Sequence, residues 1–553
     1  MDNRKLAALL FPDVTLTPED LEIKYPPRAL PEGARVTRFA PSPTGYLHIG
    51  GLFGALIDVM VAKASQGVSF LRIEDTDKKR EINDGVSAII KGFDAFDLKF
   101  TEGVTGFGTE KGDYGPYTQS QRVPIYHIVA KRLVEEGKAY PCFCTAEELT
   151  ALRERQETDG ALIRGYFGKY AKCRDLTPEE IEANLAAGKP WVLRFRSEGS
   201  EDKRIVFEDL VRGKIEMPEN TIDEVLLKSN GIPTYHFAHV CDDHFMRTTH
   251  VIRGEEWLSS VPKHIAMFKA CGYKTPKYVH TAQVMKLDDE TGDKRKLSKR
   301  KDPEAAVSFF VEKGFPKEAV IEYLLTLLNS NFEDWRRANP DADAMDFPFN
   351  LKKMGASGCL FDLVKLTDVS KNVISHMKAA DIYDRVAAWA REYHPDFYTV
   401  FTADPAFSTA ILNIDREVPK PRKDLAKWDE VEDYLSFFFN EPDADPALLP
   451  ERVSPADAKA ILACCCARYE PNEDKDAWFA RMKTWCPDLG FCPEVKEYKK
   501  NPDAFKGHVG DLSSVVRLAV TGRTNTPDLC TIMQLLGREK VSARLNRFAG
   551  KLG

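Results

Sequence analysis

The stretch Arg35–Gly54 has the sequence RVTRFAPSPTGYLHIGGLFG, which predicts a β-strand, a turn and the start of a helix. Apolar and polar residues alternate over Val36–Phe39 as in a strand, and the prolines and glycine that follow prevent its continuation. Apolar residues with helical spacing begin at Leu52. Because the first turn of a helix carries free N–H groups and the positive end of the helix dipole, this turn is suited to an anion.

Three glycines and one histidine stand at this helix start. Gly50, Gly51 and Gly54 allow a large planar or phosphorylated ligand to approach the main chain, and His48 lies at the mouth of the turn. A bare His-x-Gly is more often part of a structural turn. The run Arg38–Gly45 followed by His48-Ile-Gly-Gly, however, resembles the first signature of class I aminoacyl-tRNA synthetases, in the form found in glutamyl-tRNA synthetases.

Length and composition describe an ordinary globular chain. With 553 residues it exceeds one ordinary core, so we expect three or four structural units, and 43% hydrophobic and 29% charged residues are typical of such proteins. The net charge of -7 gives no general attraction to nucleic acid. RNA binding would need local basic runs such as Lys294–Lys301 and Arg538–Lys551, which could equally be solvated surface.

The sequence predicts a cytoplasmic protein. No apolar run is long enough to span a bilayer, and Met1–Leu10 is too short and too charged for a secretory signal. The twelve cysteines include Cys464–Cys466 and do not form a regular disulfide framework, so most are expected to be buried thiols. Residues 1–34 form an extension with a short helix at Arg4–Leu10, for which the sequence indicates no function.

A second strand delivers acidic side chains to the same region of the fold. Val68–Asp77 is rich in β-forming residues and ends in carboxylates, and acids at the end of such a strand lie where open α/β sheets bind ligands. Solvated loop acids would give the same pattern. The segment resembles the Arg-Ile-Glu-Asp-Thr-Asp of the glutamyl-tRNA synthetases, and the resemblance implies that Glu74 binds the amino acid. Gly115–Arg122, followed by Tyr126, resembles another part of the same nucleotide-binding fold.

From residue 140 to 221 the pattern changes. Two polar helical patterns flank a predicted strand at Trp191–Arg196, and Ile205–Gly213 continues in β style. The resemblance implies an α+β insertion that splits the nucleotide-binding domain and handles the acceptor end of tRNA.

Three cysteines in this insertion suggest a metal site. Cys142, Cys144 and Cys173 could hold a structural Zn²⁺ if a fourth ligand were found, and some members of the family bind zinc at the equivalent place. Tyr166 and Tyr170 are the available oxygens, although neither has the expected spacing. Unliganded thiols are the alternative.

The nucleotide-binding fold resumes at Ile222 and contains a candidate carboxylate receptor. The planar guanidinium of Arg253 can grip an acid with two charge-assisted hydrogen bonds, while Tyr235 can add a hydroxyl and Trp257 an apolar wall. The resemblance carries the glutamate contacts of the family onto Arg38, Ala40, Ser42, Glu74, Tyr235, His239 and Arg253. An asparagine is common in the family where this sequence has His239.

A basic loop follows at Lys294–Arg300. Its lysines can meet a triphosphate that becomes more negative as its α–β bond breaks, although an isolated basic loop could be solvated. Lys296-Leu-Ser-Lys-Arg resembles the second class I signature, with a leucine where methionine is often found. The resemblance implies that His48, Lys296 and Lys299 are catalytic. It also implies ATP contacts at His48, Gly50, Gly51, Lys296, Ser298 and Lys299.

From Pro316 onward the pattern is almost wholly helical. The resemblance, which a helical terminal region assigns to the bacterial type of glutamyl-tRNA synthetase, implies an α/β fold with a Rossmann-type domain split by an insertion and followed by an all-α C-terminal region for the anticodon. The predicted divisions are an extension (1–34), a first catalytic half (35–139), the insertion (140–221), a second catalytic half (222–306), a helical stem-contact domain (307–370) and the anticodon-binding region (371–553).

The resemblance implies a monomeric glutamate–tRNA ligase that uses ATP and Mg²⁺. It would activate L-glutamate to glutamyl-adenylate and transfer it to the 3′-terminal adenosine of tRNA(Glu); the sequence leaves open whether tRNA(Gln) is also charged. Two alternatives are a synthetase-like RNA-binding protein without catalysis and an enzyme that transfers glutamate to a modified tRNA base. The long helical C-terminal region opposes the second, and the presence of His48 and Lys299 opposes the first.

Overall fold

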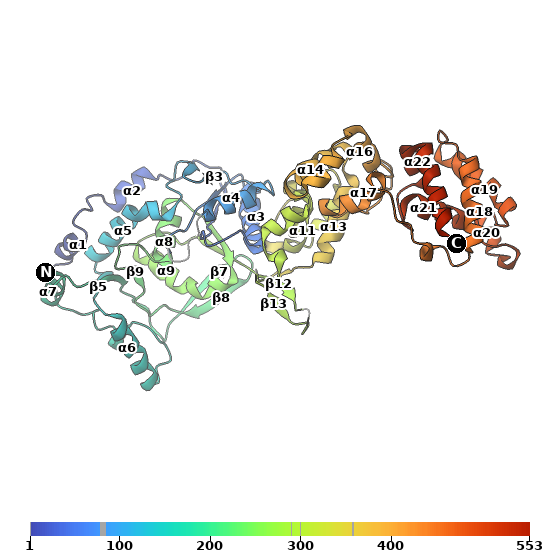
Figure 1. Cartoon of the computed structure of the whole chain (residues 1–553). Helices are drawn as coiled ribbons and strands as arrows, with labels where there is room; N and C mark the ends of the chain where they lie inside the picture. Colours follow the sequence, from blue (N-terminus) through green and yellow to red (C-terminus); the bar gives the residue numbers. More distant parts are fainter. Residues whose placement is uncertain (1, 78–83, 289, 299, 357–358) are drawn as a thin grey trace. The chain divides into compact units, whose positions relative to one another are not determined.

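The computed structural model describes residues 2–77, 84–288, 290–298, 300–356 and 359–553. The chain divides into two compact units, which Figure 1 traces along the sequence. Unit 1 comprises residues 1–310 and 321–362, and unit 2 comprises residues 311–320 and 363–553. The second unit resumes at Leu363, within the segment that the sequence assigned to a stem-contact domain.

The first half of unit 1 is built on a largely parallel sheet. Strands β1 (Val36–Phe39), β2 (Val68–Leu71) and β3 (Glu102–Gly106) are parallel neighbours, and β4 (Thr109–Lys111) pairs with β3 in antiparallel fashion. The predicted strand at Val36–Phe39 is confirmed. β2 is buried along its whole length, as expected of a strand covered on both faces.

The second half adds strands on the other side of β1. Strands β10 (His250–Gly254) and β11 (Lys277–Thr281) are parallel, and the N–H of Thr249 donates to the Val36 carbonyl at 3.0 Å. The strand order is therefore β3-β2-β1-β10-β11. Successive strands are added on one side of β1 as far as β3, and β10 and β11 are then added on its other side, so the order switches between β1 and β10. In open α/β sheets, ligands bind at such a switch point, beyond the carboxyl ends of the strands.

Helices pack on this sheet, and the first of them confirms the predicted helix start after His48. Helix α3 begins at Ile49, directly after His48, and buries most of its residues. The other helices of the two catalytic halves are α4 (Gly85–Asp94), α5 (Val123–Glu135), α8 (Tyr235–Phe245) and α9 (Val261–Ala270), with α3 spanning Ile49–Lys63.

The insertion is divided differently from the prediction. Strands β5 (Ala139–Cys142), β6 (Val192–Phe195) and β9 (Val225–Leu227) form a small antiparallel sheet, so the insertion sheet extends beyond residue 221. The hairpin of β7 (Arg204–Asp209) and β8 (Gly213–Pro218) instead joins the catalytic sheet, through one pairing of Tyr278 with Asp209.

The two polar helices of the insertion, α6 (Ala146–Thr158) and α7 (Pro178–Ala186), both precede β6. The sequence had placed one on each side of that strand. Each begins with a threonine in a reciprocal capping box, which sets its start more firmly than its weak apolar pattern does.

The N-terminal extension is tied to the catalytic domain. It contains α1 (Asn3–Leu10), as predicted, and a second helix α2 (Pro18–Lys24) that the sequence analysis missed. Arg28 forms a bidentate pair with Glu102 at 2.7 and 3.0 Å, with its own side chain 6% exposed. Residues 2–34 thus form an N-terminal strap that is bonded to the rest of unit 1.

A third small sheet carries the basic loop. Strand β12 (Val284–Leu287) pairs with β13 (Lys294–Lys296) in a hairpin and with β14 (Cys359–Leu360) in parallel. The segment between β13 and β14 contains the helices α10 (Val307–Lys313), α11 (Lys317–Leu328) and α12 (Phe332–Ala338).

In the part of the chain that the structure describes, unit 2 is helical throughout. Its helices are α13 (Leu363–His376), α14 (Ala379–Tyr393), α15 (Pro395–Phe401), α16 (Pro405–Leu412), α17 (Val431–Phe439), α18 (Pro455–Arg468), α19 (Lys475–Leu489), α20 (Val495–Tyr498), α21 (Val509–Thr521) and α22 (Leu529–Lys551). Its core contains aromatic residues such as Trp428, Phe438 and Trp485.

The basic run in α22 is largely satisfied within the unit. Arg544 is 3% exposed and donates to the Val520 carbonyl, and Arg547 pairs with Glu441 at 3.1 Å. This part of the predicted RNA-binding run is therefore occupied by internal contacts. Across the described ranges, no helix is both long and apolar enough to cross a membrane.

Candidate active site

A cleft of about 720 Å³ opens at the carboxyl ends of the strands on both sides of the switch point. Each strand delivers part of its wall: Ala40 follows β1, Glu74 follows β2, Arg253 lies near the end of β10, and Thr281 ends β11. The cleft thus collects side chains that are more than two hundred positions apart in sequence.

Most of the predicted site residues line this cleft. They are Arg38, Ala40, Ser42, His48, Gly50, Gly51, Glu74, Tyr235, Arg253 and Lys296, together with Trp257. His239 is completely buried and is not part of the lining. Ser298 lies in the adjoining loop, and Lys299 lies outside the described residues.

His48 fixes the start of α3. Its backbone is extended and its Nδ1 accepts a hydrogen bond from the N–H of Gly50 at 2.9 Å, so that the imidazole itself caps the helix. A Cβ on Gly50 would lie 3.2 Å from that nitrogen, so a side chain there would crowd the cap. The sequence places glycine where the histidine, the helix start and a ligand must share space.

The loop of the second signature is anchored by one acid. Asp302 accepts two hydrogen bonds from Arg295 at 2.6 and 2.7 Å and one from the N–H of Ser298 at 2.9 Å. These bonds lower the pKa of Asp302, which therefore stays ionised. Lys296 ends β13 at the edge of the cleft, so the hairpin and Asp302 together set its position.

Beneath the cleft lies a buried network of arginines and carboxylates. Arg72, which has no exposed surface, donates to Asp243 at 2.7 Å and to Glu74 at 3.2 Å. Arg38 pairs with the same Asp243 at 3.2 Å. Asp242 accepts from Arg122 at 2.5 Å. The charges of Arg38 and Arg72 are therefore compensated by acids of α8.

Glu74 sits at the boundary between this network and the cleft. Burial raises the pKa of its carboxyl to about 7, although the nearby charges of Arg72 and Arg38 oppose the rise. A carboxyl with such a pKa is poised between its two forms at neutral pH. A cationic group placed beside it would favour the ionised form.

Arg253 has a different environment. Its guanidinium donates to Nε2 of His280 at 3.1 Å, lies 3.3 Å from Nδ1 of His264 and donates to the Trp257 carbonyl at 3.4 Å. Tyr235 lies against Trp257, with the ring centroids 4.4 Å apart. The group is partly exposed to the cleft, so donors of the guanidinium remain for a ligand.

His239 supports the cleft from below. Its Nδ1 is 2.6 Å from Asp243, and its ring stacks nearly parallel to that of Tyr235 at 5.9 Å. Burial lowers its pKa to about 4, so it is neutral at pH 7. The geometry places His239 behind Tyr235, at a distance from a ligand in the cleft.

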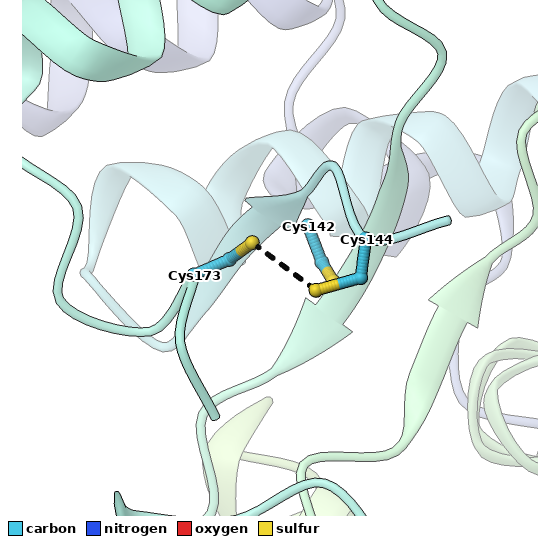
Figure 2. A group of neighbouring side chains, drawn as sticks. All are labelled: Cys142, Cys144 and Cys173. Atoms are coloured by element: carbon cyan, nitrogen blue, oxygen red, sulfur yellow. Dashed lines mark hydrogen bonds between the residues drawn. The ribbon is translucent and has the colours of Figure 1, made fainter. Parts of the chain in front are cut away.

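Outside the cleft, the three cysteines of the insertion come together (Figure 2). Their sulfur atoms lie within 4.8 Å of one another, and Sγ of Cys144 is 3.6 Å from that of Cys173. Two thiolates bound tetrahedrally to one Zn²⁺ lie about 3.8 Å apart, so this spacing fits the metal. Hydrogen bonds from Cys144 and Cys173 lower the pKa of Cys142, which favours its thiolate.

The structure also supplies a fourth donor. The hydroxyl of Tyr166 lies 3.3 Å from Sγ of Cys144 and accepts a hydrogen bond from the N–H of Cys173 at 2.9 Å. The spacing of Tyr166 in the sequence had argued against it as a ligand. The loop folds back on itself, however, and brings the Tyr166 hydroxyl to the thiols. Tyr170 instead donates to Asp159 at 2.8 Å.

Sequence reasoning missed the residues that hold the predicted ones. His264 on α9, His280 on β11 and Asp209 on β7 have no motif that marks them as functional. The only signal was a high density of histidines between residues 236 and 280. Of these, His236, His239, His264 and His280 are buried or half-buried and lie beside Arg253 or Tyr235.

Comparison with known proteins agrees with this geometry. Residues 35–335 match the model of the class I tRNA synthetases (E and Q), catalytic domain, and residues 496–549 match that of an anticodon binding domain. The chain is 50% identical over 552 residues to a glutamate–tRNA ligase of Clostridium perfringens, with 99% of this chain and all of that one covered. It is 43% identical to the corresponding ligase of Sorangium cellulosum, with 98% and 100% covered.

Solved structures give the same result. A crystal structure of a glutamate–tRNA ligase from Elizabethkingia meningosepticum, in complex with its amino acid, superposes with a TM-score of 0.76 at 26% identity. The alignment covers 94% of this chain and 100% of that one. A split parallel sheet, a cleft at its switch point and full-length relatives therefore agree: the chain belongs to the glutamate–tRNA ligase family of class I synthetases.

Proposed function

We propose that this protein attaches L-glutamate to tRNA in two ATP-dependent steps within the cleft at the switch point. The observation that carries the proposal is the arrangement of charge along the cleft. Arg253 of β10 and Glu74, which follows β2, line it, as do the start of α3 with His48 and Lys296 of β13. An amino acid with an acidic side chain suits the first pair of residues, and a polyphosphate suits the second group.

The amino acid would be held by opposite charges at its two ends. Arg253 would grip the γ-carboxylate, with Tyr235 beside it, and Glu74 would accept hydrogen bonds from the α-ammonium group. Arg38, Ala40 and Ser42 line the same wall and would complete the subsite. We assign His239 to support of Tyr235, because it is completely buried.

In the first step, an oxygen of the substrate α-carboxylate attacks the α-phosphorus of ATP. The bond between that phosphorus and the bridging oxygen breaks, and pyrophosphate leaves. His48, held in place by its cap on α3, would hydrogen-bond to the α-phosphate. The glycines of α3 would let the nucleotide approach the main chain closely. Lys296 would neutralise charge that develops on pyrophosphate, and ATP would enter as its magnesium complex.

In the second step, a hydroxyl of the terminal adenosine of tRNA attacks the activated carbonyl, and AMP leaves. Positioning and charge stabilisation suffice for both steps, since no covalent intermediate with a side chain is required. The helical unit 2, with its match to an anticodon binding domain, supports tRNA as the acceptor. Unit 2 also opposes transfer of glutamate to a modified base of tRNA and leaves the choice between tRNA(Glu) and tRNA(Gln) to experiment.

We further propose that the insertion holds a structural Zn²⁺. Cys142, Cys144 and Cys173 would supply thiolates and Tyr166 an oxygen, which gives the four donors that a structural Zn²⁺ takes. Zinc bound there would fasten the loop before α7 to the end of β5. Burial raises the pKa of Tyr166, so the phenol is protonated in the metal-free protein, and the charge of a bound Zn²⁺ would have to lower that pKa for the oxygen to coordinate.

The test of the function is charging of two separate transcripts, tRNA(Glu) and tRNA(Gln), with labelled glutamate, ATP and Mg²⁺. Charging of tRNA(Glu) alone would identify a discriminating ligase, and charging of both would identify one with broader acceptance. Charging of neither by the folded protein would refute the proposal. A parallel reaction with labelled glutamine measures the selectivity for the acidic side chain.

A further inference from the structure

Behind the cleft lining, around Arg253, lies a hydrogen-bonded chain with three histidines that the proposed reaction does not use. It runs from Asp209 through His280 to Arg253 and continues through His264 to His236. The links are 2.7, 3.1, 3.3 and 2.9 Å long. His264 and His280 have no exposed surface, so neither can contact a ligand in the cleft directly.

Hydrogen-bond chemistry fixes the tautomers along this chain. A guanidinium has only donors, so Nε2 of His280 and Nδ1 of His264 must both be acceptors. His280 then carries its proton on Nδ1 and donates it to Asp209, and His264 carries its proton on Nε2 and donates it to His236. The partners of Arg253 are therefore two neutral rings and a peptide carbonyl.

The other cleft arginine is held quite differently. Arg38 pairs with Asp243, whereas Arg253 has no ion pair with any of the residues that the structure describes. Burial and the charge of Arg253 keep the pKa of His264 well below its usual value, and burial lowers that of His280 as well. Among the described residues, the charge of Arg253 thus faces the cleft without a directly paired counter-ion, since the ring of His280 separates it from Asp209.

We propose that His264 and His280 are positioning residues that hold Arg253 through neutral acceptors, so that its uncompensated charge selects the carboxylate of glutamate over the amide of glutamine. The proposal rests on the proposed function, in which Arg253 receives the substrate side chain. A carboxylate holding the same arginine would orient it equally well but would cancel the charge. An anionic and an amide side chain would then bind with similar strength.

An isosteric pair of variants separates orientation from charge. His264→Asn keeps a neutral acceptor near the position of Nδ1, and His264→Asp puts a carboxylate in the same place. The measured quantities are the KM for glutamate and for ATP in tRNA charging, and the Ki of glutamine as a competitor of glutamate. His250→Asn and His250→Asp provide the matched control, because His250 is also buried in unit 1 but its ring bonds to Thr249 and not to Arg253.

We expect the KM for glutamate to rise by no more than about threefold in His264→Asn and by about 10- to 100-fold in His264→Asp, the range of a charge-assisted hydrogen bond. The KM for ATP and the Ki of glutamine should change little in either variant. Equal effects of the two substitutions, or a parallel loss of glutamine binding in His264→Asp, would overturn the proposal and indicate a structural role.

A second variant keeps the proposal testable if His264→Asp does not fold. Asp209 accepts from the ring of His280 at 2.7 Å and from its N–H at 2.9 Å, and it lies outside the cleft lining. Asp209→Asn would turn an amide N–H toward Nδ1, so His280 would direct its own N–H at Arg253. We expect at least a tenfold rise in the KM for glutamate with an unchanged KM for ATP; a folded variant with an unchanged glutamate KM would refute the role of His280. Failure of the wild-type protein to charge any tRNA would instead refute the proposed function.

Discussion

Glu74 makes glutamate binding dependent on pH in a direction that can be calculated. Burial raises the pKa of its carboxyl to about 7 in the free protein, and only the ionised form can hold the substrate ammonium group. The ammonium keeps its proton throughout the neutral range. The affinity for glutamate is therefore fully present above this pKa and is lost as the pH falls through it.

With a pKa of about 7, the ionised fraction of Glu74 rises from about 9% at pH 6 to about 91% at pH 8. The KM for glutamate should accordingly fall about tenfold over this interval. The assay is the initial rate of tRNA charging against glutamate concentration, at saturating ATP and tRNA, for a series of pH values. Glu74→Gln is the matched control, since it keeps the shape of the side chain and removes its titration.

We expect Glu74→Gln to have a high KM for glutamate, about 10- to 100-fold above that of the wild type at pH 8, with little dependence on pH. Its profile also reports any other group that titrates in the same range. A wild-type KM that is constant from pH 6 to pH 8, or an identical slope in Glu74→Gln, would show that this carboxyl does not bind the ammonium group.

Four further outcomes are expected. Lys296→Ala should lower kcat for charging by about 10²-fold with a nearly unchanged KM for glutamate, because its contact strengthens as pyrophosphate leaves; a change in KM alone would contradict this. Tyr166→Phe should weaken zinc retention during dialysis against a chelator, measured by elemental analysis beside Tyr170→Phe, which should keep the metal. Glu102→Gln should destabilise the packing of the N-terminal strap by about 1–3 kcal/mol and lower the melting temperature, since it breaks the bidentate pair with Arg28. Gly314→Ala should destabilise unit 2 by about 1–3 kcal/mol in thermal or denaturant unfolding, because its φ is +74° and a Cβ would lie 2.6 Å from that of Trp428; unaltered unfolding would contradict it.

The local architecture of the cleft could be predicted because local signals determine it. The strand at Val36–Phe39 and the helix start after His48 follow from alternation, proline and glycine, which act within a few residues. The insertion boundary could not be predicted in the same way. The β7–β8 hairpin joins the catalytic sheet through the single pairing of Asp209 with Tyr278, and no local pattern encodes so small a contact.

The partners of the predicted residues were equally inaccessible to the sequence. Arg253 could be singled out by its chemistry, but its acceptor His280 lies on another strand and His264 on a helix whose apolar pattern resembles that of any amphipathic helix. Tyr166 was set aside on spacing, although a folded loop brings its hydroxyl to the thiols. Side chains from separate elements meet through tertiary packing, which one sequence does not reveal.

The buried arginines and acids of unit 1 are better explained by positioning than by stability. Taking Arg72, Asp242 and Asp243 out of water costs several kcal/mol per ion, and their mutual attraction does no more than offset this cost in many proteins. Apolar residues of similar volume could fill the same space. What such residues could not do is hold Arg38 and Glu74 at fixed places in the wall of a polar cleft. The acids of α8 compensate the charges of Arg38 and Arg72, whereas the histidines leave the charge of Arg253 uncompensated. Acid partners therefore mark the arginines that shape the cleft, and imidazole partners mark the arginine that attracts its ligand.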